Sequence, residues 1–297
     1  GIIPVLEDNR LAPIIKTEQL THIYSKGTPF EHLALDAVDF SAERGEFLGI
    51  IGQTGSGKST LIQHLNGLLK PDSGRVLFEG QDIWQSKVFN NSVRFKVGLV
   101  FQYPEYQLFE ETVFKDISFG PKNMGLKPAE IEERVYEAAD FVGLGEDILK
   151  KSPFDLSGGE RRRAAIAGVI AMRPEVLILD EPTAGLDPFG RMNLMKNIRN
   201  YHEKNGATVI LVTHNMEEIA READRMIVLS DGRISLSGTP EEIFARAELL
   251  ESMRLEVPDI TKVFLELRRL GVNVPRSVYT IEQAKKAILN REGGSLF

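Results

Sequence analysis

Eight residues between an apolar run and a helix-like segment constrain this 297-residue chain more than any other feature. They read Gly52-Gln53-Thr54-Gly55-Ser56-Gly57-Lys58-Ser59 and match the pattern GxxxxGK[ST]. The apolar run at 47–51 predicts a buried strand, and residues 59–62 begin a helix. Glycines let backbone N–H groups turn toward an anion, and the start of a helix adds its positive end. The pattern therefore predicts a loop that cradles phosphate groups between a strand and a helix.

The side chains at the end of this loop have separate expected tasks. Lys58 is expected to reach the β- and γ-phosphates of a nucleotide, and Ser59 to offer its hydroxyl to Mg²⁺. The predicted nucleotide-binding residues of this segment are Gly52, Gln53, Thr54, Gly55, Ser56, Gly57, Lys58, Ser59 and Thr60.

A second apolar run, at 176–179, ends in two acidic residues, Asp180 and Glu181. At the carboxyl end of a parallel strand, Asp180 is placed to hold Mg²⁺, directly or through water. Glu181 is placed to orient and deprotonate an attacking water. Taken alone, the segment also fits an ordinary exposed loop. Together with the phosphate loop, it predicts the second half of a nucleotide-hydrolysing site.

Composition excludes several classes of function. The chain has 36 Lys and Arg against 43 Asp and Glu, so its formal net charge is −7, which argues against nucleic acid as the main partner. Without cysteine there is no disulfide, thiolate metal site or cysteine nucleophile. No apolar run approaches the ~20 residues of a membrane-spanning helix. Residues 1–13 lack the pattern of a secretion signal and are expected to be an N-terminal extension, whose native origin stays open.

Apolar runs and helical patterns alternate along the chain. Runs at 75–78, 97–101 and 208–212 add further expected strands, and residues 192–204 an expected helix. Between 114 and 172 the pattern is helical, with Ile131, Val135, Ala138 and Val142 at helical spacing, a stop at Gly143, and a second helix at 160–172. The alternation predicts an α/β fold whose parallel sheet is covered on both faces and carries a helical insertion.

The chain after Pro240 is expected to be mainly helical. A capping box at Thr280 and Gln283 predicts the start of a last helix. One apolar stripe ending before Gly271 is predicted to pack on the core or, alternatively, on a partner subunit, and it consists of Ile260, Val263, Phe264, Leu267 and Leu270.

The segment Leu156-Ser157-Gly158-Gly159-Glu160 resembles the signature sequence of ABC-type ATPases, which usually ends in Gln. The resemblance implies that the helix opened by Ser157, Gly158 and Gly159 faces the γ-phosphate of ATP held by a partner subunit. Glu160 departs from the pattern. Its carboxylate is expected either to disfavour that anion mildly or to be held away by Arg161, Arg162 and Arg163. Of these, Arg163 matches the family pattern, and the other two are expected on a solvated or interfacial face.

Four further positions fit this family in order and spacing. Gln102 resembles the Q-loop glutamine, which contacts Mg²⁺ or water, and Asp187 belongs to a segment resembling the D-loop at the dimer interface. His214 resembles the switch histidine that contacts the γ-phosphate. Tyr24 lies where the family places an aromatic ring against adenine, with Phe30 as the rival. The resemblance thus implies Glu181, His214, Lys58 and Gln102 as catalytic residues and Ser59, Gln102 and Asp180 as the Mg²⁺ site.

This family resemblance implies an architecture and its bounds. We expect a P-loop NTPase core of the ABC ATPase type at residues 14–240, with a mainly parallel sheet, an antiparallel β subdomain and a helical subdomain inserted at about 103–172. Residues 241–297 are expected to form a short helical C-terminal extension.

Four local segments resemble the ATPase subunits of energy-coupling factor transporters, namely 101–113, 116–121, 152–154 and 184–188. The resemblance implies an ATPase motor that binds ATP and Mg²⁺ and pairs with a similar or identical ATPase. The pair is expected to dock under a transmembrane coupling protein, while a separate membrane subunit captures a vitamin or transition-metal ion. The chain would then be peripheral, on the cytoplasmic face of the cell membrane.

Three other functions compete with this interpretation. A conventional ABC importer subunit differs only in the segment at 103–113. A non-transport ABC ATPase of DNA repair or translation typically has long coiled-coil insertions or two motor domains, and neither pattern is found. A nucleotide-binding module without turnover would not need Glu181 and His214.

The segment at 103–109 is aromatic and apolar and suits docking on a membrane partner. The neighbouring acids Glu105, Glu110 and Glu111 are expected to meet basic helices of that partner. The alternative is that this segment packs against its own helical subdomain.

Overall fold

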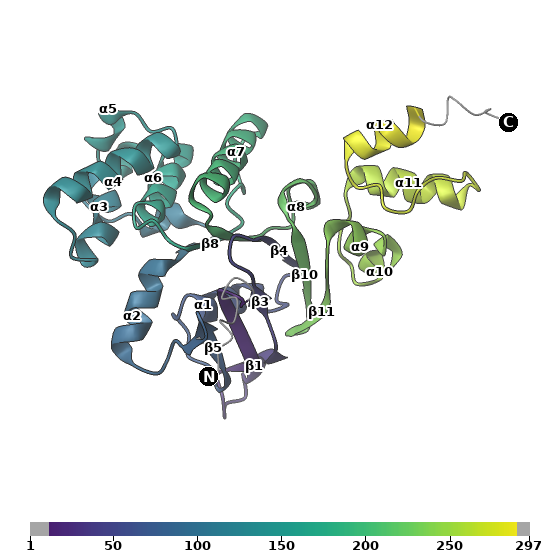
Figure 1. Ribbon diagram of the computed structural model, residues 1–297, viewed down its shortest axis with the longest axis horizontal. Helices are drawn as coiled ribbons and strands as arrows, with labels where there is room; N and C mark the ends of the chain where they lie inside the picture. The colour runs from purple at the N-terminus through teal and green to yellow at the C-terminus, as the bar shows by residue number, and fades with distance from the viewer. Residues whose placement is uncertain (1–11, 290–297) are drawn as a thin grey trace, which may run out of the picture.

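The computed structural model describes residues 12–289 and contains two sheets with helices on both sides (Figure 1). The larger sheet has six strands in the order β11-β10-β4-β9-β8-β7, and all its pairs are parallel except β10 with β11. The strands are β4 (Phe47–Gly52), β7 (Val97–Val100), β8 (Val176–Asp180), β9 (Thr208–Val212), β10 (Arg225–Ser230) and β11 (Arg233–Gly238). The mainly parallel α/β sheet predicted from the sequence is confirmed.

The central strands are buried on both faces, which explains their continuous apolar runs. Because successive side chains of a strand point to opposite faces, Leu177 and Leu179 belong to one apolar cluster, while Val176 and Ile178 belong to another. Helices cover these faces, among them α1 (Lys58–Leu65), α7 (Pro188–Asn205) and α8 (Met216–Glu222). Two apolar layers thus fix the carboxyl ends of the strands at one edge.

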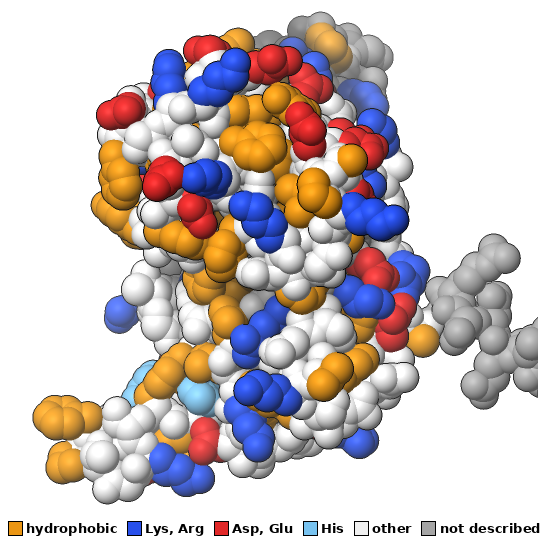
Figure 2. Space-filling view, turned by 90° about the vertical axis from the view of Figure 1, so that its left-hand side faces the viewer, with side chains coloured by type: hydrophobic (Ala, Val, Ile, Leu, Met, Phe, Trp, Pro, Cys, Tyr) orange, Lys and Arg blue, Asp and Glu red, His pale blue; other side chains and the backbone are white. Residues whose placement is uncertain are grey.

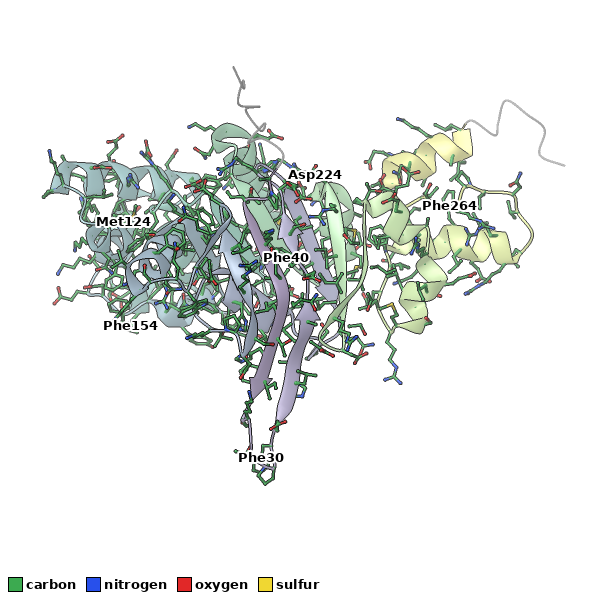
Figure 3. The ribbon with its side chains drawn as sticks, turned by 60° about the horizontal axis from the view of Figure 1, so that its bottom comes forward. Phe30, Phe40, Met124, Phe154, Asp224 and Phe264 are labelled. Atoms are coloured by element: carbon green, nitrogen blue, oxygen red, sulfur yellow. The ribbon has the colours of Figure 1, made fainter. Side chains whose placement is uncertain are left out.

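The second sheet is antiparallel and lies toward the N-terminus of the chain. Its strands are β1 (Ile15–Tyr24), β2 (His32–Val38), β3 (Ser41–Ala42), β5 (Ser73–Phe78) and β6 (Gln81–Asp82), and α2 (Lys87–Lys96) leads from it to β7. The turn between β1 and β2 projects from the molecule and carries Phe30 at its tip (Figure 3). This sheet is the antiparallel β subdomain of the prediction.

Helices fill the chain between β7 and β8 and form a separate lobe in Figure 1. They are η1 (Pro104–Gln107), α3 (Val113–Asn123), α4 (Pro128–Phe141), α5 (Glu146–Leu149), η2 (Pro153–Asp155) and α6 (Gly158–Ile170). The predicted stop after α4 is found, since Gly143 has φ +70°. Helix α6 begins two residues before the predicted Glu160 and ends two residues before Met172.

The C-terminal part consists of α9 (Pro240–Phe244), α10 (Ala247–Ser252), α11 (Asp259–Arg269) and α12 (Ile281–Leu289). The predicted capping box is present, with Gln283 N donating to Thr280 Oγ1 at 3.2 Å. The predicted stripe on α11 is wrong in part: Val263 and Leu270 are exposed, whereas Leu265 is buried in the main core. The reason is that α11 has apolar residues on two faces, and Phe264 packs locally against α12.

Some of the predicted bounds fall where the structure describes little. Only residues 12 and 13 of the expected N-terminal extension are described, and residues 290–297 lie outside the described range. Over residues 12–289, no helix combines the length and the apolarity that crossing a bilayer requires.

Candidate functional site

The phosphate loop leaves the carboxyl end of β4 and enters α1 at Lys58. Gly57, the last loop residue, has φ +102°, a conformation that side chains with a Cβ rarely adopt. A Cβ at this position would also lie 2.6 Å from the carbonyl oxygen of Ala34 in β2. Strain and close backbone approach together explain why the turn into the helix requires glycine.

Lys58 bends back over the loop. Its Nζ donates to the carbonyl oxygens of Gly52 at 2.6 Å and Gln53 at 2.8 Å. Burial lowers the pKa of Lys58, against the opposing effect of the Glu181 and Asp180 carboxylates. The ammonium is thus held at the floor of the loop, where it faces both acids that end β8.

The hydroxyl of Ser59 donates to Asp180 Oδ2 at 3.1 Å. Burial raises the pKa of Asp180, because taking a carboxylate out of water disfavours its charge. The bond from Ser59 opposes this shift, and the nearby Glu181 adds to it. Two adjacent oxygen donors, one of them a buried carboxylate that a cation would stabilise, fit Mg²⁺.

Glu181 has an unusual backbone, with φ +49°. Such strained residues are common at active sites, and this one is fixed by its N–H, which donates to Val212 O at 2.8 Å. Its buried carboxylate lies 2.8 Å from Nδ1 of His214 and accepts from the Thr213 hydroxyl at 3.4 Å. The His214 side chain is 78% exposed, so in the Glu181–His214 pair the carboxylate is buried and the imidazole is open to solvent.

Lys58, Ser59, Asp180 and Glu181 line one cleft of about 360 Å³, whereas the predicted catalytic residue His214 is not among its lining residues and reaches it only through Glu181. Its lining residues are Tyr24, His32, Ala34, Thr54, Gly55, Gly57, Lys58, Ser59, Thr60, Gln102, Asp180 and Glu181. Sequence reasoning missed His32 and Ala34, since no motif marks the β2 residues that lie against the loop. The cleft therefore gathers the loop, both acids, the expected Q-loop glutamine and an aromatic residue.

The structure separates the two aromatic candidates for adenine. The Tyr24 hydroxyl lies 3.2 Å from Thr60 Oγ1, and its ring packs edge-on to His22 at a centroid distance of 4.5 Å. Phe30 is 83% exposed at the tip of the β1–β2 turn and does not line the cleft (Figure 3). Tyr24 is thus the aromatic residue on the cleft wall.

The signature segment and Asp187 do not line this cleft. Ser157 is the N-cap of α6, followed by Gly158 and Gly159 in its first turn. Asp187 is the N-cap of α7, and its carboxylate accepts from Gly190 N at 2.7 Å. Within one chain, these predicted nucleotide contacts lie apart from the residues that surround the phosphate loop.

The expectation that arginines hold Glu160 away is wrong. Its carboxylate accepts from Ser157 N at 2.8 Å and from the Ser157 hydroxyl at 2.6 Å, while Glu160 N donates to Ser157 Oγ at 3.3 Å. This is a capping box, formed because a Ser N-cap and a Glu three residues later satisfy each other's backbone donors. The bonds from Ser157 are the largest cause that lowers the pKa of Glu160, and the charges of Lys151 and Arg163 add smaller effects.

Two further expectations about charged residues need correction. Arg162 does not lie on a solvated or interfacial face but is buried. Its guanidinium contacts Glu105 at 3.4 Å, so Glu105 is not free to meet a basic partner helix. Glu111 is exposed and forms an ion pair with Lys115. Arg162 and Glu105 pair with each other because unpaired charge is costly to bury.

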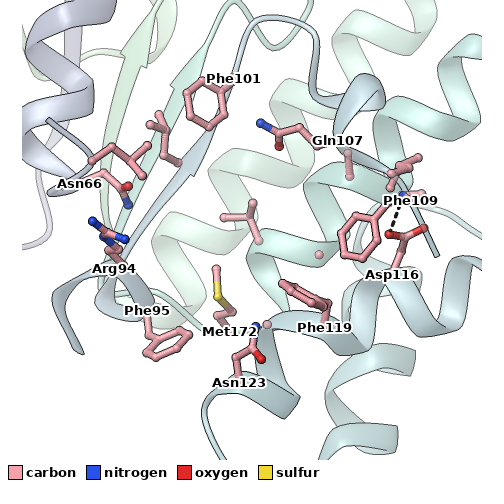
Figure 4. Close-up of a pocket in the computed structure, with 18 residues that line it drawn as sticks. Asn66, Arg94, Phe95, Phe101, Gln107, Phe109, Asp116, Phe119, Asn123 and Met172 are labelled. Carbon is pink, nitrogen blue, oxygen red and sulfur yellow. Dashed lines mark hydrogen bonds between the residues drawn. The ribbon is translucent and has the colours of Figure 1, made fainter. Parts of the chain in front are cut away.

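A second cavity of about 430 Å³ lies between the helical lobe, α2 and the end of β7 (Figure 4). It is mainly apolar, with the aromatic rings Phe95, Phe101, Phe109 and Phe119 on its walls. Asp116 also lines it, accepting from the backbone N–H groups of Phe109 and Glu110 at 3.2 Å each. Figure 2 looks onto the helical lobe and shows apolar side chains along the hollow beneath it. We call this cavity the lobe groove.

The buried carboxyl of Glu218 is expected to make the stability of the fold depend on pH. Burial raises the pKa of this carboxyl, which accepts from the Thr183 hydroxyl at 3.1 Å. The folded state therefore binds the proton more tightly than the unfolded chain, and this group makes stability fall as pH rises from the unfolded pKa through the raised one. Glu218→Gln should raise Tm at pH 8 by a few degrees, about 1 kcal/mol, and by less at pH 5.

Thermal unfolding at both pH values, with the exposed Glu203→Gln as control, tests this effect. A lower Tm for Glu218→Gln at pH 8 would contradict the cost assigned to the buried charge.

Comparison with known proteins agrees with the geometry. A sequence profile described as ABC transporter matches residues 35–184. The energy-coupling factor transporter ATP-binding protein EcfA2 of Caldanaerobacter subterraneus subsp. tengcongensis is 57% identical over 275 residues, which cover 93% of this chain and 96% of that protein. EcfA2 of Clostridium perfringens is 54% identical over 276 residues, covering 93% and 97%.

Solved structures give the same result. The structure of cbiO1 from Clostridium perfringens, described as part of the ABC transporter complex cbiONQ, has a TM-score of 0.71 and 42% identity, and covers 85% of this chain and 98% of that chain. A dimeric, post-hydrolysis structure of the ATP-binding cassette MJ0796 bound to ADP and Pi has a TM-score of 0.70 and 28% identity, covering 76% and 98%.

The phosphate loop, the paired acids and the signature helix are thus found in one fold with close relatives over nearly the whole chain. ATP hydrolysis coupled to transport is the activity of this group. The chain belongs to the ABC transporter ATP-binding proteins, among those of energy-coupling factor transporters.

Proposed function

We propose that this chain supplies half of each of two ATP-hydrolysing sites, and that a second ATPase subunit, identical or similar, completes them. The observation that carries the proposal is the division of the motif residues: the phosphate loop, Asp180 and Glu181 line one cleft, while Ser157 and Gly159 lie outside it. The MJ0796 cassette, similar in fold, was solved as a dimer with ADP and Pi. A head-to-tail pair would bring the α6 start of one chain to the cleft of the other.

Each residue of the cleft has a proposed task. Lys58 holds the β- and γ-phosphates, and Glu181 orients the attacking water and takes its proton, because its carboxylate is fixed by His214 and Thr213. Ser59 and Asp180, with Gln102, would hold Mg²⁺, which when bound neutralises phosphate charge. Tyr24 lies against the adenine ring of the nucleotide.

The lobe groove is the proposed docking site for a transmembrane coupling protein. Its walls join α2, η1, α3 and α6, so an occupant would contact the helical lobe and the end of β7 near Gln102 at once. Phe109 and Phe119 pack edge-on at 5.0 Å and remain 59% and 45% exposed, which suits an apolar helix. The similar cbiO1 protein is described as part of a transporter complex.

This docking site implies where in the cell the chain lies and what the transporter carries. The chain would lie peripherally on the cytoplasmic face of the membrane, and a separate membrane subunit would select a vitamin or transition-metal ion. Nucleic acid is not among the proposed partners, given the net charge of −7.

We further propose that residues 14–240 form the ATPase domain and residues 241–297 a C-terminal extension.

Phe109→Asp tests this function by co-purification from native membranes. A charge in the apolar groove should weaken the complex about 30-fold, since anchor residues contribute about 2 kcal/mol or more. The tagged chain should bring down a second ATPase and membrane proteins, and Phe109→Asp should lose the membrane proteins while its ATP affinity is unchanged.

Val88→Asp, at an 80% exposed site near the start of α2, is the matched control and should keep the membrane proteins. Recovery of only soluble companions with the unaltered chain would contradict the proposed function.

A further inference from the structure

Arg162 lies in the second turn of α6 and has partners that no motif assigns. Its side chain is 6% exposed. Nη2 donates to the carbonyl oxygen of Gln102 at 3.2 Å, Nη1 donates to the carbonyl oxygen of Ala184, and Nε and Nη2 lie 3.4 Å from the carboxylate oxygens of Glu105. One buried guanidinium thus binds two backbone carbonyls and a carboxylate.

The three partners come from three different parts of the site. Gln102 lines the nucleotide cleft directly after β7, and Glu105 belongs to η1, beside the lobe groove. Ala184 lies in the turn after β8, and its N–H donates to the carbonyl oxygen of Glu181 at 3.2 Å. Helix α6, which carries Arg162, begins at the signature residues. The guanidinium therefore connects the cleft, the groove and the turn that holds the catalytic acid.

The chemistry of arginine suits this connection. A planar guanidinium has five N–H donors in a fixed fork, so it can hold several acceptors at set angles, whereas a lysine ammonium on a flexible stem cannot. Because the group is buried, its charge must be compensated, and Glu105 does so. Arg162 does not line the nucleotide cleft, so it does not act on ATP directly.

We infer that Arg162 is a positioning residue: it keeps the Gln102 backbone and the turn from Glu181 to Asp187 in their hydrolytic arrangement, and it ties both to η1. Displacement of η1 by an occupant of the lobe groove would thereby reach the catalytic turn. The link to the groove rests on the proposed docking function. The link to the catalytic turn rests on hydrogen bonds within this chain.

The test measures kcat, KM and ATP affinity for the purified ATPase pair without membrane protein. Arg162→Gln should lower kcat about 10-fold or more and leave KM and ATP affinity within about 2-fold, because the cleft residues that bind ATP are untouched. Arg162→Lys should restore only part of kcat. Arg173→Gln, which alters an exposed arginine paired with Glu137, is the control and should match the unaltered chain.

A double variant separates positioning from folding. Arg162→Gln leaves the Glu105 carboxylate without its partner, so Tm is expected to fall. Arg162→Gln with Glu105→Gln removes both charges and should recover Tm while kcat stays low. Recovery of kcat together with Tm would overturn the inference, as would an unchanged kcat in Arg162→Gln.

The outcome is independent of the docking proposal. If kcat falls as expected but Phe109→Asp keeps its membrane proteins, Arg162 still positions the catalytic turn, and the proposed docking site is wrong. If kcat is unchanged, the inference fails whatever Phe109→Asp does.

Discussion

Glu181→Gln should stop ATP turnover without preventing ATP binding. The carboxylate is the expected base for the attacking water, and general-base catalysis contributes about 10²–10⁴-fold. Glutamine has nearly the same shape and can still accept from Thr213, but it cannot take a proton. Because ATP is bound and not cleaved, the variant should accumulate as a closed, ATP-bound dimer with the partner ATPase.

Phosphate release and light scattering in the presence of ATP and Mg²⁺ measure both effects. Glu203→Gln, an exposed carboxylate on α7, is the control and should turn over ATP like the unaltered chain. If Glu181→Gln hydrolysed ATP at the unaltered rate, another group would have to be the base.

Lys58→Ala should remove nucleotide binding. Its ammonium is the cation of the phosphate loop, already held against the carbonyls of Gly52 and Gln53. A hydrogen bond to a charged group contributes about 1.5–3 kcal/mol, and the lysine is expected to contact two phosphates. Since about 1.4 kcal/mol corresponds to tenfold in affinity, the loss should be about 100-fold or more.

Calorimetric titration with ATP gives the affinity directly, and Lys70→Ala, an exposed lysine just after α1, serves as the matched control. An unchanged ATP affinity in Lys58→Ala would remove the phosphate loop from the site.

The phosphate loop and the acids after β8 were predictable because their signals are local. A strand buried on both faces reads as a continuous apolar run, and the run at 176–179 became β8 with Asp180 at its end. The loop geometry requires a glycine at position 57 and a phosphate-binding lysine at position 58, so these residue types alone predict the loop. The capping box of Glu160 also has a local signal, a serine three residues before a glutamate, and this signal outweighs the nearby arginines that were expected to hold the carboxylate.

Other features depend on contacts between distant segments. Arg162 lies 57 and 22 residues from Glu105 and Ala184, and nothing in its own neighbourhood distinguishes it from an exposed arginine. Strands β10 and β11 were not among the predicted strands, although residues 226–229 are apolar. The predicted stripe on α11 was wrong in part for the same reason, because packing against α12 buries Phe264 and leaves Val263 exposed.

The central claim is that the signature helix of one chain completes the ATP site of another, and substitution of Gly159 tests it most directly. A Cβ at Gly159 meets only the end of the Arg163 side chain, at 3.7 Å, so Gly159→Asp should not disturb the fold. Its carboxylate would face the γ-phosphate across the dimer and repel it. The neutral Gly159→Asn has nearly the same shape and separates charge from size.

The measurement is ATP-induced dimerisation by light scattering, with the Glu181→Gln substitution in every chain of the pair. Gly159→Asp should bind ATP with unchanged affinity yet fail to dimerise, whereas Gly159→Asn should retain most of the dimer. Full dimerisation of Gly159→Asp in this background would contradict the shared site. So would full turnover of Gly159→Asp in chains that keep Glu181, at a rate per molecule that does not depend on protein concentration.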